Sequence, residues 1–289
     1  MASSLDLQVD VYVAPPIPTT SGSDDPTKQW WSPISCTLIH GPTSAVLVDT
    51  PISIKQTEAL AAWIKQTAPG KQLKYIYTTH AHGDHYFGNP VILKHFPEAT
   101  SVTTSLVATG IRDTLASAIP RWKGWFPNGQ ILSEGHIIPD SLPETGEFSI
   151  DGHSLFGINV AHSDTDASSF LHVPDLKLVV AGDIVYGDCF QFLAEAKTAD
   201  KRKDWLDALD QIAALEPNIV VPGHKRATQV DGPYLIEATK GYIVAFEEEL
   251  ERLGDVDKVE QAMTKRYPQR WNRFILEMSC KSSVAALKL

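Results

Sequence analysis

Apolar and polar positions follow one another along the first half of the chain in an order that predicts strands and helices. Residues 36–50, CTLIHGPTSAVLVDT, predict a strand, a turn at GPTS and a second, buried strand that ends at Asp49. Apolar residues at helical spacing follow over 54–67, and a Pro-Gly pair ends that helix. An apolar strand over 73–80 then leads directly to His80.

The second half of the chain repeats this order with little sequence identity. Residues 168–183 predict strand, turn and strand ending at Asp183, residues 203–217 an amphipathic helix, and residues 218–224 a strand that delivers His224. Two such ββαβ halves would pack sheet against sheet and keep their helices outside. The sequence therefore predicts an α/β protein built as a four-layer αββα sandwich, with the polar strand ends of both halves at one edge.

Three further stretches belong to neither half. Residues 14–34 are rich in Pro, Ser, Asp and Thr and predict a loop. Residues 106–148 contain a Pro- and Gly-punctuated aromatic segment, which we interpret as an inserted loop or short helices near the site. Residues 233–289 carry helical apolar spacing, and no second domain boundary is visible, so we expect one domain over 1–289.

Composition narrows the class of partner. The chain has 289 residues, a net charge of −10 and no cluster of Lys and Arg, which argues against binding nucleic acid. No apolar run reaches the length of a membrane span, and the first residues do not resemble a secretory signal. The three cysteines are far apart and in no paired motif. We expect a cytoplasmic protein whose partner is a small-molecule substrate.

The densest chemistry lies in TTHAHGDHYFGNP, residues 78–90. Imidazole and carboxylate groups are costly to bury without partners, and metal ligation explains such a cluster better than packing does. His80 and His82 are two residues apart and can point the same way, whereas Asp84 and His85 follow a glycine that permits a sharp turn. Four ligands this close would crowd one ion, so two ions are the simpler interpretation.

Three more candidate ligands each stand where an apolar strand meets a polar turn. His162 lies in NVAHSDTDASS, Asp183 ends LVVAGD and His224 ends VVPGH. With the first cluster these residues make five histidines and two aspartates, enough for two ions that share a bridging carboxylate.

At this point the chain resembles the metallo-β-lactamase superfamily. HAHGDH fits its HxHxDH signature, and LVDT, AHSDTD, AGD and PGH match its other motifs in order over residues 35–226. The resemblance implies the αββα fold, two Zn²⁺ ions per chain with Mn or Fe as alternatives, and one carboxylate that orients the ligands. The implied roles are His80, His82 and His162 on the first ion, Asp84, His85 and His224 on the second, Asp183 bridging and Asp49 behind them.

The resemblance also implies a mechanism. Two ions held by these residues would lower the pKa of water toward neutrality and so would supply a nucleophile for hydrolysis at a carbonyl carbon. Asp84 would orient this nucleophile and later return its proton. In lactonase-like relatives a tyrosine at the offset of Tyr186 bonds the substrate carbonyl; the alternative is a tyrosine of the core.

The aspartate at position 183 separates the chain from the antibiotic-degrading lactamases, which typically lack it, and favours the glyoxalase, lactonase and related hydrolase branches. Aromatic residues in the two long loops suit a flat apolar substrate, the alternative being that they only anchor the loops. These pocket candidates are Trp30, Trp31, Trp122 and Trp125. The chain resembles members that open lactams or lactones of small xenobiotics, including aromatic-fused rings such as benzoxazolinones.

Three other functions stay open at this stage. A thioesterase of the glyoxalase II type would need basic residues near the site, and Lys225 and Arg226 follow His224. A non-haem iron oxidoreductase on the same fold is the second. A non-catalytic binding module is the third.

Overall fold

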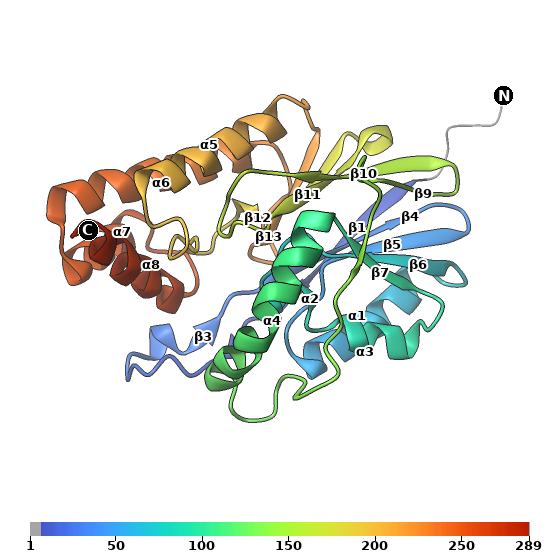
Figure 1. Ribbon diagram of the computed structural model, residues 1–289, viewed down its shortest axis with the longest axis horizontal. Coiled ribbons are helices and arrows are strands. Elements are labelled where there is room, and N and C mark those ends of the chain that lie inside the picture. The colour runs from blue at the N-terminus through green and yellow to red at the C-terminus, as the bar shows by residue number, and fades with distance from the viewer. Residues whose placement is uncertain (1–6, 289) are drawn as a thin grey trace.

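Two β-sheets packed face to face form the centre of the computed structural model, which describes residues 7–288 (Figure 1). The first sheet has the strand order β1 (Gln8–Ala14), β4 (Ile34–His40), β5 (Ser44–Val48), β6 (Gln72–Tyr77), β7 (Thr100–Thr103) and β8 (Asp140–Ser141). The second has the order β13 (Ile219–His224), β12 (Leu178–Tyr186), β11 (Ser169–Val173), β10 (His153–Asn159) and β9 (Glu147–Ile150). A separate ribbon pairs β2 (Ile17–Pro18) with β3 (Trp30–Trp31).

Helices cover the outer face of each sheet. The first sheet carries α1 (Ile54–Thr67) and α3 (Asn89–His95). The second carries α5 (Ala199–Ala213) and α6 (Tyr234–Leu253), with α7 (Val256–Arg266) and α8 (Arg273–Ala286) beyond them. The remaining helical segments are α2 (Gly83–Tyr86), α4 (Ser105–Trp125), η1 (Pro26–Lys28) and η2 (Pro174–Leu176). The predicted four-layer αββα arrangement is confirmed.

Strand alternation explains why both faces of each sheet are apolar. In the paired strands β4 and β5, Ile39 and Val46 point between the sheets, whereas Leu38 and Leu47 point outward and pack with Leu60 of α1. All of these side chains are buried. A sheet covered on both faces requires such continuous apolar strands, and this is the pattern in the sequence.

The predicted repeat is present in the hydrogen bonding. Helix α1 joins β5 to the parallel strand β6, and helix α5 joins β12 to the parallel strand β13. Each connecting helix begins with a side-chain cap, because Ser53 accepts from the amide of Gln56 and Thr198 accepts from the amide of Lys201. These crossovers bring the carboxyl ends of all four strands to the same edge.

The segment between the halves differs from our expectation of a loop or short helices over 106–148. It begins as one 21-residue helix, α4, capped by Thr104 and continuing through Pro120. The apolar face of this helix, including Ile111 and Trp122, packs into a buried aromatic cluster, and this packing outweighs the loss of a backbone donor at the proline. Over the described chain, no helix combines the length and apolarity that crossing a bilayer requires.

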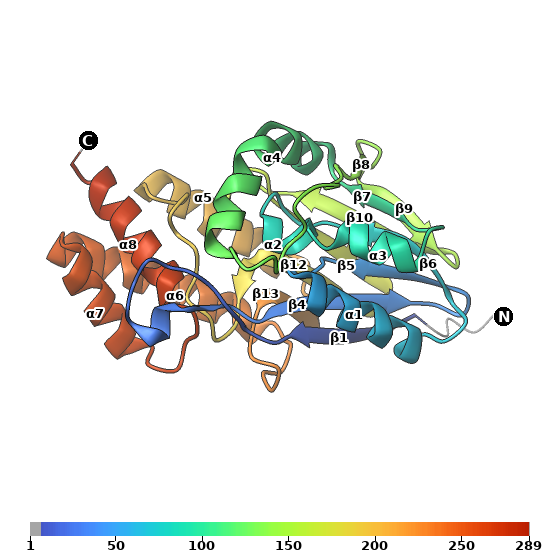
Figure 2. The same ribbon diagram turned by 90° about the horizontal axis from the view of Figure 1, so that it is seen from below.

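Ion pairs fasten the 14–34 segment to the C-terminal helices. Lys28 lies 2.9 Å from both Glu260 and Glu277, and Arg273 lies 3.1 Å from Glu260 and 3.6 Å from Asp25. Figure 2 shows α6, α7 and α8 gathered at one end of the sheets, and η1 of the 14–34 segment contacts α8 there. Parts of the chain outside the two repeated halves therefore form one unit at that end.

Asp151 joins the two sheets at the end opposite the ligand motifs. With Gly152 it forms the turn between β9 and β10, and both residues have positive φ, 49° and 88°. Its carboxylate accepts hydrogen bonds from the amides of Thr43 and Ser44, each at 2.9 Å, and from both hydroxyls. Burial acts to raise the pKa of Asp151, but these hydrogen bonds outweigh it and lower that pKa to about 2.

We expect Asp151→Asn to lower the free energy of unfolding by about 1–3 kcal/mol near neutral pH. Both carboxylate oxygens of Asp151 accept hydrogen bonds, and the asparagine side chain keeps only one acceptor oxygen. The native pKa lies below the unfolded value, so this contribution is complete above about pH 4 and is lost as pH falls toward 2. Urea denaturation at a series of pH values checks this, with the exposed Asp140→Asn as control. A difference that stays constant down to pH 2 would contradict the assignment.

Candidate metal centre

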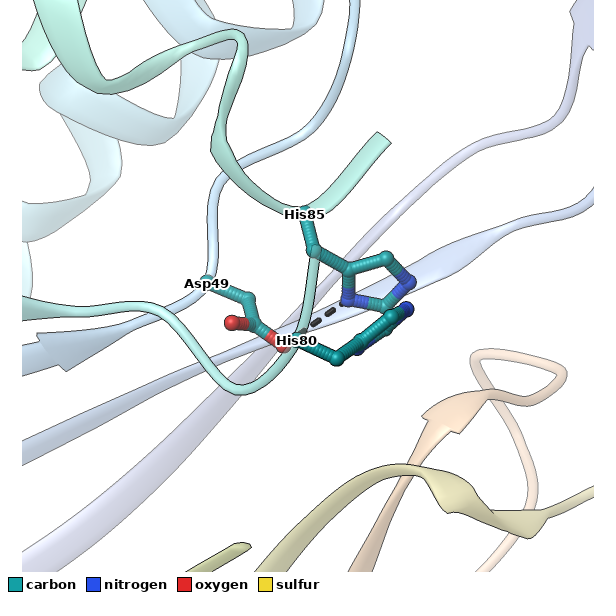
Figure 3. A group of neighbouring side chains, drawn as sticks. All are labelled: Asp49, His80 and His85. Atoms are coloured by element: carbon teal, nitrogen blue, oxygen red, sulfur yellow. Dashed lines mark hydrogen bonds and ion pairs between the residues drawn. The ribbon is translucent and has the colours of Figure 1, made fainter. Parts of the chain in front are cut away.

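The carboxyl ends of four strands deliver the first group of polar side chains. Asp49 follows β5, His80 follows β6, and Asp183 and His224 lie in β12 and β13. All four side chains are buried. Figure 3 shows Asp49 and His80 beside His85, which comes from the short helix α2. The topology therefore gathers residues that are far apart in the sequence.

Hydrogen bonds on the outer side of the rings fix the orientation of two histidines of the first half. Nδ1 of His85 lies 2.8 Å from Asp49, and Nδ1 of His80 lies 2.9 Å from the hydroxyl of Thr79. Asp49 also accepts from the amide and hydroxyl of Thr79, each at 2.8 Å. Asp49 thus acts through His85 and Thr79, and both Nε2 atoms are left for the centre.

The two histidines of the second half are held in the same way. Nδ1 of His162 lies 2.8 Å from Asp166, and Nδ1 of His224 lies 2.8 Å from the carbonyl oxygen of Pro33. Asp166 is in turn bonded by Lys201. In this arrangement each Nε2 lone pair is available to an ion.

The spacing at the second predicted site fits a metal ion. Two ligand atoms that each lie about 2.1 Å from a tetrahedral zinc are about 3.4 Å apart. Nε2 of His224 lies 3.3 Å from Asp183, 3.4 Å from Asp84 and 3.4 Å from Nε2 of His85. Nε2 of His85 lies 3.3 Å from the other oxygen of Asp183. These four residues could hold one ion with little movement.

Buried atoms without partners point to the same centre. Among residues 7–288, Nε2 of His80 and Oδ1 of Asp183 have no hydrogen-bond partner although they are inaccessible to solvent. Nε2 of His162 is also buried and unpaired there, but it belongs to none of the groups of potential ligands that converge within 4.8 Å in the described chain. Most buried polar atoms in proteins are hydrogen-bonded, so several unpaired ones at one place require a ligand. Imidazole nitrogens and carboxylate oxygens are donors that zinc and similar ions accept.

The electrostatics of the protein without metal show what the carboxylates do. Burial acts to lower the pKa of His85, but the carboxylates of Asp183 and Asp49 outweigh it and raise that pKa to about 10. Burial acts to raise the pKa of Asp183, but His224 and His85 hold it well below its ordinary value. The site is therefore built for positive charge, which protons or metal ions can supply.

The backbone around Asp183 leaves no room for further side chains. Gly223 follows the proline of the PGH motif, and a Cβ atom there would lie 2.0 Å from the carboxylate of Asp183. Gly182 has a positive φ of 51°, and a Cβ there would meet Thr79 at 2.5 Å. Both glycines let the second half approach the ligands closely.

His82 is oriented differently from the other predicted ligands. Its Nε2 lies 3.3 Å from Glu195, and its Nδ1 faces inward, 2.7 Å from Asp164. Sequence analysis missed both acidic residues. Asp164 stands two residues after His162 in a polar run at a strand end, the signal used for the other ligands, so it could have been found. Glu195 lies in a loop with no such signal.

The structure places Tyr186 behind Asp183. Its side chain is 2% exposed, and its hydroxyl donates to Asp183 at 2.5 Å. Burial, followed by the charge of Asp183, raises the pKa of Tyr186 well above its ordinary value, so it remains a proton donor. Tyr186 also borders the pocket beside the centre. In the protein without substrate its hydroxyl is bonded to the predicted ligand Asp183.

Three of the four predicted pocket tryptophans border the pocket, and Trp30 does not. Strand alternation in β3 explains the difference, because adjacent side chains point to opposite sides. Trp31 is turned inward and its indole N–H donates to Asp84 at 2.9 Å, whereas Trp30 is 41% exposed. Trp31 stacks on Trp125 with ring centroids 5.6 Å apart, and Trp122 packs edge-on against both.

A family model of the metallo-beta-lactamase superfamily matches residues 30–224, which include every predicted metal ligand. This chain belongs to the metallo-beta-lactamase superfamily. No curated protein sequence matches it significantly.

Solved structures of metallo-beta-lactamases share the fold at low sequence identity. A metallo-beta-lactamase from Pontibacter korlensis is 23% identical over 83% of this chain and 99% of its own, with a TM-score of 0.57. A metallo-beta-lactamase family protein from Thermus thermophilus is 18% identical over 96% and 93%, with a TM-score of 0.61. The metallo-beta-lactamase FIM-1 from Pseudomonas aeruginosa, in its mono-zinc form, is 18% identical over 83% and 96%, with a TM-score of 0.54.

The family match ends before the C-terminal helices. The matched residues end at His224, so α6, α7 and α8 lie outside them. The inward-facing Trp31 lies at the start of the match and contacts a predicted ligand. The pocket is therefore bordered mainly by residues within the matched range, and Asn272, Ile275 and Met278 complete it from outside that range.

The hydrogen bond from Trp31 to Asp84 gives a direct test of the centre. We expect Trp31→Phe to weaken zinc binding by about 10–100-fold, because a donor that orients a ligand is lost. Zinc affinity measured by competition with a chelator checks this. Trp30→Phe is the matched control: because Trp30 is exposed, this variant should bind zinc as tightly as the unaltered protein does. Equal affinity in both variants would show that the indole does not position Asp84.

Proposed function

We propose that this chain is a dinuclear zinc hydrolase that opens a small cyclic amide or ester. The observation that carries the proposal is the spacing of Asp84, His85, His224 and Asp183, whose ligand atoms lie 3.3–3.4 Å apart, as around a tetrahedral ion. His80, His82 and His162 would hold the first ion, and Asp183 would lie between the two. The buried carboxylates of Asp84 and Asp183 would balance the positive charge of metal ions bound at this centre.

Bound zinc would supply Lewis acidity, polarising a carbonyl oxygen and lowering the pKa of water. The side chains of this chain supply the positioning. Asp84 is a buried carboxylate oriented by Trp31, and the imidazole of His85 helps to hold its pKa below the ordinary value against the effect of burial. It therefore stays ionised and can orient the nucleophile by accepting its hydrogen bond, and in the proposed reaction it would later return the proton to the leaving group.

The pocket beside the centre supports an apolar, flat substrate. Its walls come from β3, from α4, from the loop after β12 and from the region of α8. The apolar wall residues are Trp31, Trp122, Trp125, Phe190, Phe192, Ile275 and Met278. Aromatic walls favour stacking of a planar ring. Together with the net charge of −10, this supports a small uncharged or aromatic-fused lactam or lactone and disfavours nucleic acid.

The thioesterase alternative loses its support from Lys225 and Arg226. The ammonium group of Lys225 is buried and bonds both oxygens of Asp231 at 2.7 Å. Arg226 lies over the ring of Trp271, 5.7 Å from its centroid, and donates to the carbonyl of Gln269. Both cations are engaged within the protein, so neither is free for the carboxylates of a glutathione thioester.

A substrate panel tests the proposed function. We expect zinc-loaded protein to hydrolyse aromatic-fused lactams or lactones in preference to glutathione thioesters and β-lactams. Asp84→Asn should lower kcat by about 10²–10⁴-fold, because it removes the proton acceptor. Activity on none of the panel, with two zinc ions bound per chain, would contradict the proposal. One iron per chain in protein purified without chelators would instead support an oxidoreductase.

The role of the aromatic wall is tested separately. Trp125 is half-buried, borders the pocket and is not itself a predicted ligand, so Trp125→Ala should raise KM about tenfold or more while kcat stays nearly unchanged. Steady-state kinetics on the best substrate of the panel check this, with Trp63→Ala, on the distant helix α1, as the control. A fall in kcat at constant KM would contradict the assignment of Trp125 to substrate binding alone.

A further inference from the structure

Asp164 is a buried carboxylate beside the two histidines that begin the first ligand motif. Its side chain is 0% exposed, and among residues 7–288 its ion-pair partners are histidines only. Oδ1 accepts from the hydroxyl of Ser163 at 2.9 Å. Oδ2 lies 2.7 Å from Nδ1 of His82 and 3.5 Å from Nε2 of His80. A carboxylate buried this deeply requires a positive partner.

The side of the rings that Asp164 faces separates it from the orienting carboxylates. Those carboxylates bond the outward nitrogens of the histidines and are Asp49, Asp166 and Glu195. Asp164 faces Nε2 of His80, the nitrogen opposite the one held by Thr79, and Nδ1 of His82, the nitrogen opposite the one held by Glu195. It therefore lies on the ligand side of both rings.

The distances around Asp164 suit a shared ion better than a hydrogen bond. The 3.5 Å between Oδ2 and His80 is close to the separation of about 3.4 Å between two ligands of a tetrahedral zinc. Oδ2 lies only 2.7 Å from Nδ1 of His82, and by geometric criteria Oδ2 and Nε2 of His80 are both buried without a hydrogen-bond partner among residues 7–288. A widening of about 0.7 Å at His82 would put Oδ2 at ligand separation from both rings. One potential ligand atom from each of His80, His82 and Asp164 already lies within 4.8 Å of the other two.

We propose that Asp164 is a ligand of the first metal ion, alongside His80, His82 and His162. The inference rests on the proposed metal centre and changes the composition of its first site, because three neutral imidazoles gain a negatively charged oxygen donor. A carboxylate donor strengthens binding of a divalent ion and shifts preference toward ions that accept oxygen ligands, such as Mn²⁺ or Fe²⁺.

The protein without substitutions gives the first test. In a crystal structure of the zinc-loaded chain, we expect an oxygen of Asp164 within about 2.2 Å of the ion bound by His80 and His82. An oxygen more than about 3 Å from that ion would overturn the proposal. This measurement does not depend on whether any variant folds.

Variants give the second test, read as metal content and not as activity. Asp164→Ala and Asp164→Asn should lower the affinity for one of the two ions at least tenfold, measured by competition with a chelator and by metal content after dialysis. The absorption spectrum of the Co²⁺-loaded protein should change, because its ligand set changes. Asp175→Asn is the control, since that carboxylate is exposed and its one ion-pair partner within residues 7–288 is His153.

The outcomes separate this proposal from the proposed function. Two ions bound with unchanged affinity and unchanged Co²⁺ spectrum in Asp164→Ala would overturn the ligand role while leaving the hydrolase intact. Tighter binding in the variant would mean that Asp164 competes with the ion for His82, which also overturns it. Weaker binding in the variants, with no hydrolysis by the unaltered protein, would support the ligand role and contradict the hydrolase.

Discussion

The structure depends on one constraint: imidazole rings and carboxylates are buried together at the edge where two sheets meet, and each ring nitrogen must have a defined partner. The outward nitrogens are satisfied by the protein, as by Asp49 for His85 and the carbonyl of Pro33 for His224. The inward nitrogens are left for positive charge. Without the outer hydrogen bonds the rings could rotate, and the inward lone pairs would not converge.

Much of this arrangement could be predicted from the sequence, because the polar residues of the site directly follow apolar strands. Apolar runs that stop at Asp49, His80, Asp183 and His224 reveal both the repeat and the edge where it converges. Parallel strands joined by a helix leave little freedom in where their carboxyl ends lie. The fold and the gathering of these four residues follow from that local pattern.

What the sequence did not reveal depends on contacts between distant segments. Trp30 and Trp31 are identical in type and adjacent, and only the pairing of β3 with β2 decides which one reaches Asp84. The helix α4 continues through Pro120 because its apolar face is buried. This burial depends on distant segments, so a proline in the local sequence does not reveal it. Asp164 was visible in the motif, but its inward direction is set by its neighbours in space.

The glycine of the PGH motif has a consequence for how such a protein can diversify. With a Cβ at position 223 only 2.0 Å from the carboxylate of Asp183, any larger residue would displace that aspartate before a substrate is ever met. Whatever substrate the pocket accepts, position 223 therefore admits only glycine as long as Asp183 keeps its place at the centre.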